Sequence, residues 1–229
     1  METRVLDLKE YKKVPKFIAV EGPIGVGKTT LAELLADSFG YETFLEKPSE
    51  NPFLEDFYKN PSQGALATQL FFLFQRVKQV QELKQNDIFS PVRVSDFLLD
   101  KDRLFAKATL SDQELTLYNQ IYNYLSIDLL SPDLVIYLQA ESKTLFERIM
   151  LRGIEMEKNI TIHYLDVLNE SYKEFFLNYD KSHVLIVNSD FLDLVNNKND
   201  YVLLLDKLLG YFNNPEGRTM YFNPSPSLL

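Results

Sequence analysis

The stretch Gly22-Pro23-Ile24-Gly25-Val26-Gly27-Lys28-Thr29 decides the fold of this chain. It matches the pattern G-x-x-x-x-G-K-[ST] in full, between an apolar run at residues 17–20 and a helical pattern at residues 28–39. A loop that leads from a buried strand into a helix turns backbone N–H groups and the positive end of the helix toward bound phosphate. The stretch therefore predicts an α/β fold that binds a nucleoside triphosphate.

The residues of this loop have distinct expected roles. The Lys28 ammonium would contact the β- and γ-phosphates of ATP, and the Thr29 hydroxyl would bind Mg²⁺. ATP and Mg²⁺ are accordingly the expected cofactors. The expected nucleotide-binding residues of the loop are Gly22, Pro23, Ile24, Gly25, Val26, Gly27, Lys28, Thr29 and Thr30.

The order of apolar runs outside the loop predicts the rest of the fold. Continuous runs typical of strands buried on both faces of a parallel sheet lie at residues 17–20, 43–45, 92–94, 134–138 and 184–187. Helical patterns alternate with them at residues 28–39, 64–85, 112–127, 143–152 and 160–179. The span between residues 45 and 92 is too long for one crossover helix, so an extra helix is expected there. We therefore expect an α/β fold, a doubly wound sheet of about five parallel strands flanked by helices on both faces.

No composition shift divides the chain into parts. Residues 1–229 are expected to form a single domain, with its core at about residues 16–210. The segment at residues 213–229 is rich in Asn, Pro and Ser, which predicts an irregular tail.

Composition excludes several classes of site and partner. The 229 residues contain no Cys and two distant His, which excludes disulfides, thiolate metal sites, a cysteine nucleophile and a multi-histidine metal site. The charge balance of 24 − 33 = −9 argues against a surface that coats nucleic acid or binds a membrane. No apolar run approaches the roughly 20 residues of a transmembrane helix, and no signal-peptide core is evident. A cytoplasmic protein is expected.

The loop alone does not distinguish a kinase from a GTPase or an ATPase. Two short matches favour a GTPase superficially, because Asn197-Lys198-Asn199-Asp200 fits N-K-x-D and Asp37-Ser38-Phe39-Gly40 fits D-x-x-G. The first lies in a polar stretch and not at the end of a buried strand. The second is the end of the helix that follows the loop, where Gly40 would form the cap. We interpret both as chance matches.

Glu46 follows the second expected strand. In a doubly wound sheet the carboxyl ends of the strands face the ligand crevice, so this carboxylate would lie near the phosphate loop. It could there accept the proton of an attacking hydroxyl, which phosphoryl transfer to an alcohol requires. A glutamate in a solvent-facing loop would have the same sequence context, so position alone leaves both interpretations open.

The residues around Glu46 form part of a longer pattern. Glu46-Lys47-Pro48, Asn51-Pro52-Phe53-Leu54 and Phe57-Tyr58 resemble the E-x-P and N-P-F-L-x-x-F-Y pattern of the deoxynucleoside kinases. The resemblance covers about residues 16 to 210 and is greatest to the bacterial deoxyadenosine/deoxyguanosine kinase branch. Further matches are Gln69-Leu70-Phe71-Phe72-Leu73, Arg76, Ser131-Pro132-Asp133-Leu134-Val135-Ile136-Tyr137-Leu138-Gln139, Arg148, Arg152-Gly153, Glu157 and Tyr164-Leu165.

The resemblance implies a P-loop kinase fold and roles on the acceptor side. Glu46 would be the general base for a 5′-hydroxyl. Gln69 and Arg76, seven residues apart and therefore on one helix face, would contact the nucleobase. Phe71, Phe72 and Phe74 would include both core packing and a wall beside the base, which is assigned to Phe72, and core packing is the alternative for each of them. Without the resemblance, the two polar residues would pass as an ordinary polar stripe.

Sugar, lid and adenine positions follow from the same resemblance. Tyr58 and Glu157 would hold the sugar 3′-hydroxyl. Arg148 and Arg152, four residues apart on one side of a helix, would belong to a helical lid and stabilise charge on the transferring phosphoryl group. An exposed helix face is the alternative for these arginines. Asn188-Ser189-Asp190-Phe191 resembles the loop that packs around the adenine of ATP, with Asp190 and Phe191 as its nucleotide-binding residues.

The sequence departs from the family after the third expected strand. Most members have Asp/Glu-Arg-Ser there, whereas this chain has Ser95-Asp96-Phe97, so the arginine is absent. Asp96 could still hold Mg²⁺ directly or through water, together with Thr29. Alignment from Asp96 brings Asp102-Arg103 near the family's base-contacting acidic residue, but alignment backwards from Phe105-Ala106 brings Lys101 there, and the register stays open. Ile154 stands where the lid often has a further arginine.

The resemblance implies ATP-dependent transfer of the γ-phosphoryl group to the 5′-hydroxyl of a deoxynucleoside, preferably a purine, in nucleotide salvage. A homodimer is implied by the same resemblance. A nucleoside monophosphate kinase of the thymidylate kinase type is one alternative. It would need extra cations for the acceptor phosphate, and Lys47 and Lys59 are the only cations between Glu46 and Gln69. A non-catalytic ATP-binding regulatory module is an alternative of another class.

Overall fold

A parallel sheet organises the computed structural model, which describes residues 6–86, 92–98, 100–125, 131–213 and 217–224. Its strands lie in the order β2-β3-β1-β4-β5-β6, and every neighbouring pair is parallel. The strands are β1 (Phe17–Glu21), β2 (Glu42–Phe44), β3 (Arg93–Ser95), β4 (Leu134–Gln139), β5 (His183–Asn188) and β6 (Thr219–Phe222). The predicted doubly wound parallel sheet is confirmed.

The C-terminal part of the chain differs from the prediction. The described residues contain six strands, not about five, because β6 lies inside the segment expected to be an irregular tail. Thr219 to Phe222 pair in parallel with Val184 to Val187 of β5, at the edge of the sheet. This strand is half-exposed, so pairing with β5 and not burial stabilises it. Helix α8 (Lys198–Asn213), which precedes it, was not expected either.

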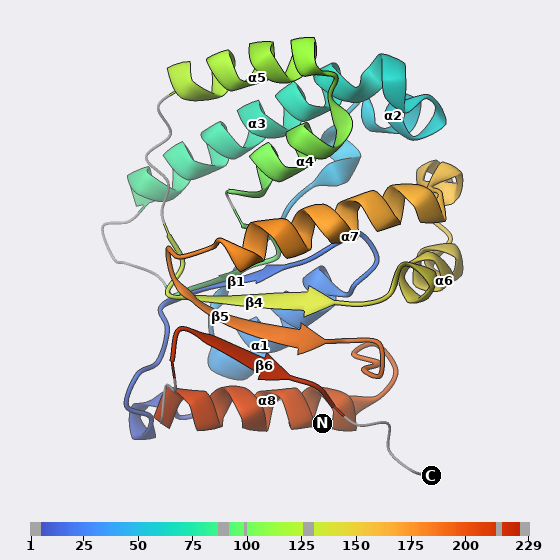
Figure 1. Ribbon diagram of the computed structural model, residues 1–229. Helices are drawn as coiled ribbons and strands as arrows, with labels where there is room; N and C mark the ends of the chain where they lie inside the picture. The colour runs from blue at the N-terminus through green and yellow to red at the C-terminus, as the bar shows by residue number, and fades with distance from the viewer. Residues whose placement is uncertain (1–5, 87–91, 99, 126–130, 214–216, 225–229) are drawn as a thin grey trace.

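Helices cover both faces of the sheet (Figure 1). Helices α1 (Lys28–Phe39) and α8 pack on one face, and α7 (Ile162–Leu177) and α4 (Lys101–Thr109) pack on the other. Strand β4 shows the alternation that this arrangement requires: Ile136 faces the α1 and α8 side, whereas Tyr137 faces α7. The Tyr137 ring stacks on Phe176 of α7 with 4.0 Å between the ring centroids.

A group of helices lies beyond α4, on the side of the sheet that α4 and α7 cover (Figure 1). It consists of α2 (Leu54–Lys59), α3 (Pro61–Asn86) and α5 (Asp112–Tyr124), and it packs on α4. Helix α2 is the extra helix expected between the second and third strands. The Asn51 side chain fixes its approach to α3, because its amide donates to the Thr68 carbonyl at 3.2 Å and its oxygen accepts from the Phe53 N–H at 3.1 Å. The last residues of the helix predicted at 112–127 lie outside the described part.

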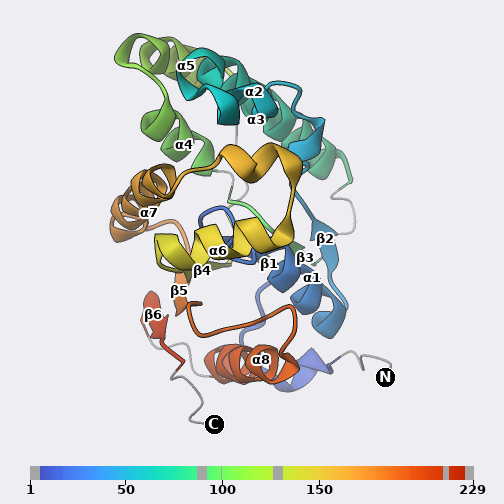
Figure 2. The same ribbon diagram turned by 90° about the vertical axis from the view of Figure 1, so that its right-hand side faces the viewer.

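Figure 2 looks toward the end of the sheet at which the strands finish. Helix α6 (Ser142–Arg152) crosses this end near β1, and the short helix η4 (Glu155–Asn159) leads from it to α7. Two further short helices are η1 (Leu8–Glu10) and η2 (Pro48–Glu50). Within the described part of the chain, none of the helices combines the length and apolar character that a membrane crossing requires.

Candidate active site

The phosphate loop joins β1 to α1 in the centre of the sheet. Gly25 has φ +82°, and a Cβ there would lie 2.8 Å from Ile149 Cγ1 of α6, so this position needs glycine for its backbone conformation and for space. Helix α1 begins at Lys28, whose Nζ donates to the carbonyls of Gly22 (2.8 Å) and Pro23 (3.0 Å). Burial and the nearby Lys101 lower the pKa of Lys28 to about 8. The loop thus holds a partly buried cation beside a helix N-terminus, which suits a polyphosphate.

A cavity of about 150 Å³ extends from this loop to α3 and α4. Its walls carry four cations, three carboxylates and several aromatic rings. The formal charge of these lining side chains is 4 − 3 = +1, whereas the whole chain has a net charge of −9. The charged residues are Lys28, Arg76, Lys101 and Arg152, and Glu46, Asp96 and Glu157. The cavity is therefore the part of this acidic protein that favours an anionic ligand.

The Glu46 carboxylate lies in this cavity between two cations. Its Oε1 accepts from Arg76 Nη1 at 2.7 Å, and its Oε2 accepts from Lys101 Nζ at 2.9 Å. Burial alone would raise the pKa of Glu46, but Lys101 and Arg76 hold it well below its usual range. Glu46 is therefore ionised at neutral pH and is a hydrogen-bond acceptor that faces the same space as Lys28.

Asp96 connects Glu46 to the phosphate loop. Its Oδ2 accepts from the Thr29 hydroxyl at 2.5 Å, and its Oδ1 accepts from the backbone N–H of Glu46 at 2.7 Å. Carboxylate and hydroxyl oxygens at the start of α1 are ligands that suit Mg²⁺. No group of three or more His, Cys, Asp or Glu able to hold a metal occurs among the described residues. A magnesium ion here would therefore need phosphate oxygens and water as its other ligands.

Helix α3 turns a polar face into the cavity. Gln69 and Arg76 both line it, as their seven-residue spacing predicts. Arg76 lies with its guanidinium carbon 5.7 Å from the centroid of Phe72 and 5.2 Å from that of Phe97. Gln69 is 3% exposed, and its amide has no hydrogen-bond partner within the described residues. A buried amide with a free donor and a free acceptor suits the edge of a nucleobase.

Helix α4 supplies Lys101 and Asp102, the two residues between which the sequence alignment did not decide. Lys101 is ion-paired with Glu46 and lines the cavity, whereas Asp102 is ion-paired with Arg76 behind the lining. Both residues of the open register therefore contact residues of the site, and the choice between the two alignments stays open. Phe105, one helical turn after Lys101, also lines the cavity and was not predicted. Other lining residues that sequence reasoning did not assign are Pro48, Leu54, Phe57, Thr68 and Tyr164.

The predicted sugar-binding residues lie together on the lid side. Tyr58 of α2 and Glu157 of η4 both line the cavity. Arg152 Nη2 donates to Glu157 Oε2 at 2.6 Å, which links the end of α6 to η4. Burial, together with the neighbouring Tyr164 and Glu157, raises the pKa of Tyr58, so its phenol is a neutral donor.

The two lid arginines have different partners. Arg148 does not line the cavity; its Nη2 donates to the carbonyls of Ser189 (2.7 Å) and Leu192 (3.0 Å) in the loop after β5. The same loop contains the predicted adenine contacts: the Asp190 carboxylate accepts from the Glu141 N–H at 2.9 Å, and Phe191 is 54% exposed. The two guanidinium groups therefore do not both line the cavity, although they are four residues apart on α6. The carbonyls of the loop after β5 bind Arg148, whereas Arg152 lines the cavity.

Glu21 is a buried carboxylate that sequence reasoning did not assign. It ends β1, has no exposed surface, and accepts from the N–H groups of Gly22 (2.8 Å) and Leu98 (2.6 Å) and from the Tyr172 hydroxyl (2.8 Å). It therefore fixes the start of the phosphate loop against the segment that leads to α4. A glutamate at the end of an otherwise apolar strand is the sequence signal that could have identified it.

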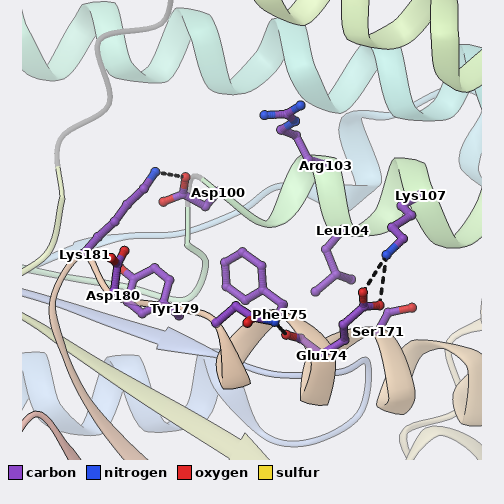
Figure 3. A pocket seen from close by; sticks show the side chains of 11 residues that line it. Asp100, Arg103, Leu104, Lys107, Ser171, Glu174, Phe175, Tyr179, Asp180 and Lys181 are labelled. Atoms are coloured by element: carbon purple, nitrogen blue, oxygen red, sulfur yellow. Dashed lines mark hydrogen bonds and ion pairs between the residues drawn. The ribbon is translucent and has the colours of Figure 1, made fainter.

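A larger groove of about 370 Å³ lies between α4 and α7 (Figure 3). Four of its charged side chains form two ion pairs, Lys107 with Glu174 at 2.8 Å and Lys181 with Asp100 at 2.5 Å. It contains no residue of the phosphate loop. The smaller cavity, which joins that loop to Glu46, is therefore the candidate active site.

Comparison with known proteins agrees with this geometry. The family model described as deoxynucleoside kinase matches residues 18–210. The chain is 38% identical over 191 residues to a deoxyguanosine kinase of Bacillus subtilis, covering 81% of this chain and 92% of that protein. It is 33% identical over 183 residues to a deoxyadenosine kinase of Dictyostelium discoideum, with 77% and 74% covered.

Solved structures give the same result. A deoxyadenosine kinase from M. mycoides with bound dATP is 31% identical with a TM-score of 0.73, covering 84% of this chain and 98% of that one. The same kinase with the products dCMP and a flexible dCDP bound has a TM-score of 0.73 and 30% identity, with 85% and 99% covered. The predicted fold and the predicted class of enzyme are thereby confirmed, and the chain belongs to the deoxynucleoside kinase family.

Proposed function

We propose that this chain transfers the γ-phosphoryl group of ATP to the 5′-hydroxyl of a purine deoxynucleoside, as a step of nucleotide salvage. One observation carries the proposal: the ionised Glu46 and the Lys28 ammonium of the phosphate loop face the same small cavity. An acceptor alcohol bound there would meet a proton acceptor on one side and a triphosphate on the other.

The residues of the chain divide into three groups in this reaction. The glycines of the loop, with Lys28, hold the triphosphate, and the loop after β5 with Asp190 and Phe191 lies on the adenine side. Gln69, Phe72 and Arg76 bind the base, and Tyr58 with Glu157 binds the 3′-hydroxyl. These contacts orient the 5′-oxygen toward the γ-phosphorus, and such positioning supplies much of the rate of phosphoryl transfer.

Glu46 receives the proton of the 5′-hydroxyl. A bond forms between O5′ and the γ-phosphorus as the bond from that phosphorus to the bridging oxygen breaks, and ADP leaves with the bonding electrons. Because its pKa is held low, Glu46 is a weak base toward the free alcohol, so the proton passes as O5′ becomes acidic in the transition state. Lys28 and the lid arginine Arg152, which both line the cavity, neutralise charge on the phosphoryl group.

Magnesium fits the oxygen ligands beside the loop. Thr29 and Asp96 would hold it, partly through water, and the ion would supply charge neutralisation for the phosphates. The Thr29 hydroxyl now donates to Asp96, so both groups are already positioned at the start of α1.

The purine preference is supported by the relatives named deoxyguanosine kinase and deoxyadenosine kinase. It is also supported by Gln69 and Arg76, which line the cavity and offer the donors and the acceptor of an amide and the donors of a guanidinium to a base edge. A monophosphate acceptor is disfavoured, because Lys47 and Lys59 pair with Glu50 and Glu55 outside the cavity.

A transfer assay with radiolabelled ATP tests the proposal. The four deoxynucleosides and their 5′-monophosphates are compared as acceptors, with magnesium and then with a chelator. We expect label on deoxyadenosine or deoxyguanosine, lost on chelation. Label on the monophosphates alone would favour a nucleoside monophosphate kinase, and ATP binding without transfer to any acceptor would favour a regulatory module.

The chain is further proposed to act in the cytoplasm as a homodimer, as family resemblance implies. Sedimentation velocity measures the second point directly. We expect a species of two 26.7 kDa chains at micromolar concentration, whereas a single-chain species at every concentration would contradict it.

A further inference from the structure

A second ammonium group besides that of Lys28 lies in the cavity. Lys101 begins α4, is 4% exposed, and extends its Nζ to 2.9 Å from Glu46 Oε2. The rings of Phe97 and Phe105 lie on its flanks, with centroids 5.9 Å and 5.8 Å from Nζ. A buried charge of this kind needs anionic partners, because water is largely excluded from it.

Lys101 is not the only cation on Glu46. Arg76 contacts the same carboxylate at 2.7 Å and is also ion-paired with Asp102. Lys101 and Lys28 line the same cavity. Two cations that repel each other across a cavity favour an anion between them. The phosphoryl group that passes from ATP to the acceptor is the anion that enters this space.

The chain lacks a cation where the family resemblance leads one to expect it. In the tripeptide Ser95-Asp96-Phe97, Asp96 stands at the position of the family's arginine, and the next residue, Phe97, is apolar and 1% exposed. The Phe97 ring lies against both Arg76 and Lys101. Lys101 of α4 follows Asp96 by five positions (101 − 96) and supplies a cation to the same cavity.

We propose that Lys101 is a catalytic residue whose ammonium passes from Glu46 to the transferred phosphoryl group. The inference rests on the proposed function. Before transfer, Lys101 is paired with the Glu46 carboxylate. As the bond between O5′ and the γ-phosphorus forms, the 5′-hydroxyl proton moves to Glu46 and ADP leaves. Glu46 is then neutral and the product carries a phosphate dianion, so Lys101 loses one anionic partner and gains another without leaving the cavity.

The test compares binding of substrate with binding of product. Lys101→Met, Lys101→Arg and the control Lys107→Met are prepared, because Lys107 is on the same helix but is exposed and paired with Glu174. Calorimetry gives the affinities for the deoxynucleoside that the unaltered chain prefers and for its 5′-monophosphate. Steady-state kinetics give kcat and KM.

We expect Lys101→Met to lower kcat by about 10²–10³-fold. It should weaken monophosphate binding by about 10–100-fold and deoxynucleoside binding by less than about threefold. Lys101→Arg should recover most of the monophosphate affinity, and Lys107→Met should match the unaltered chain. Equal losses for nucleoside and monophosphate, or an unchanged kcat, would overturn the inference.

Two further outcomes are distinguishable. If the unaltered chain phosphorylates no deoxynucleoside, the proposed function fails and the inference fails with it, whereas an active chain indifferent to Lys101→Met rejects the inference alone. If Lys101→Met does not fold by circular dichroism, the double variant Glu46→Gln/Lys101→Met keeps the pair neutral. It should bind the monophosphate about tenfold more weakly than Glu46→Gln does, and equal affinity would reject the inference.

Discussion

Replacement of Glu46 by Gln tests the proton acceptor of the proposed reaction. Glutamine keeps the shape of the side chain, but it cannot take the proton of the 5′-hydroxyl. Loss of a general base lowers kcat by about 10²–10⁴-fold, which corresponds to about 3–5 kcal/mol of transition-state stabilisation. ATP affinity should be nearly unchanged, because Glu46 pairs with Arg76 and Lys101 and not with the phosphate loop.

The same substitution should also lower the free energy of unfolding. Removal of one partner of a buried ion pair typically costs about 3–5 kcal/mol. The loss here should be at the lower end, since Arg76 keeps its pair with Asp102. Stability is measured by urea denaturation, and kcat is measured on protein that circular dichroism shows to be folded.

Glu55→Gln provides the matched control for Glu46→Gln. Glu55 is 58% exposed and pairs with Lys59 on the surface of α2, so its loss should change both kcat and stability little. The assay follows formation of deoxynucleoside monophosphate at saturating ATP. Turnover of Glu46→Gln within about threefold of the unaltered chain would refute the assignment of the proton acceptor.

Gln69→Leu should raise the KM for the deoxynucleoside by about 10–100-fold, because the hydrogen bonds of the amide to the base are lost, and should leave the KM for ATP unchanged. A deoxynucleoside KM equal to that of the unaltered chain would show that Gln69 does not contact the base. Gly25→Ala should weaken ATP binding and lower the melting temperature, since its Cβ would meet Ile149 at 2.8 Å. The control Gly210→Ala has open space in α8 and should raise the free energy of unfolding by about 0.5–1 kcal/mol. Equal changes of stability in the two variants would contradict the close approach of Gly25 to Ile149. Lys28, with its pKa lowered to about 8, is charged below that pH and loses its charge above it. The ATP dissociation constant, followed by calorimetry, should therefore rise between about pH 8 and 9, and a constant value would contradict the partly buried ammonium.

The phosphate loop and the place of Glu46 could be predicted because they depend on chain order. A strand followed by a glycine-rich turn and a helix has one geometry, and the carboxyl ends of parallel strands meet at one end of the sheet. The seven-residue spacing of Gln69 and Arg76 was equally decisive, because α3 is regular where they lie. These are local or topological properties, which a sequence records directly.

The contributions of α4 could not be predicted in the same way. The described residues between β3 and Lys101 form no regular element, so no periodicity assigns a direction to the side chains that follow them. Contacts from distant parts of the chain fix the register, among them Arg76 with Asp102 and Glu46 with Lys101. Once α4 is known to begin at Lys101, the i, i+4 spacing of Lys101 and Phe105 gives the rest.

The C-terminal elements illustrate two different failures. Helix α8 carries an apolar pattern at Tyr201, Leu204, Leu208 and Tyr211 that indicates an amphipathic helix, so the signal was present in the sequence. Strand β6 is four residues long and alternates between exposed and half-exposed positions. Its existence depends on the free edge of β5, which the sequence of residues 219–222 does not describe.

A crystal structure with a bound deoxynucleoside and a non-hydrolysable ATP analogue tests the central claim most directly. The quantity to measure is the distance between the Glu46 carboxylate and the 5′-oxygen of the acceptor. The account predicts a hydrogen bond of about 2.6–3.2 Å, with that oxygen on the side of the γ-phosphate. A sugar whose 5′-oxygen lies beyond reach of Glu46, or points away from the phosphate loop, would contradict it.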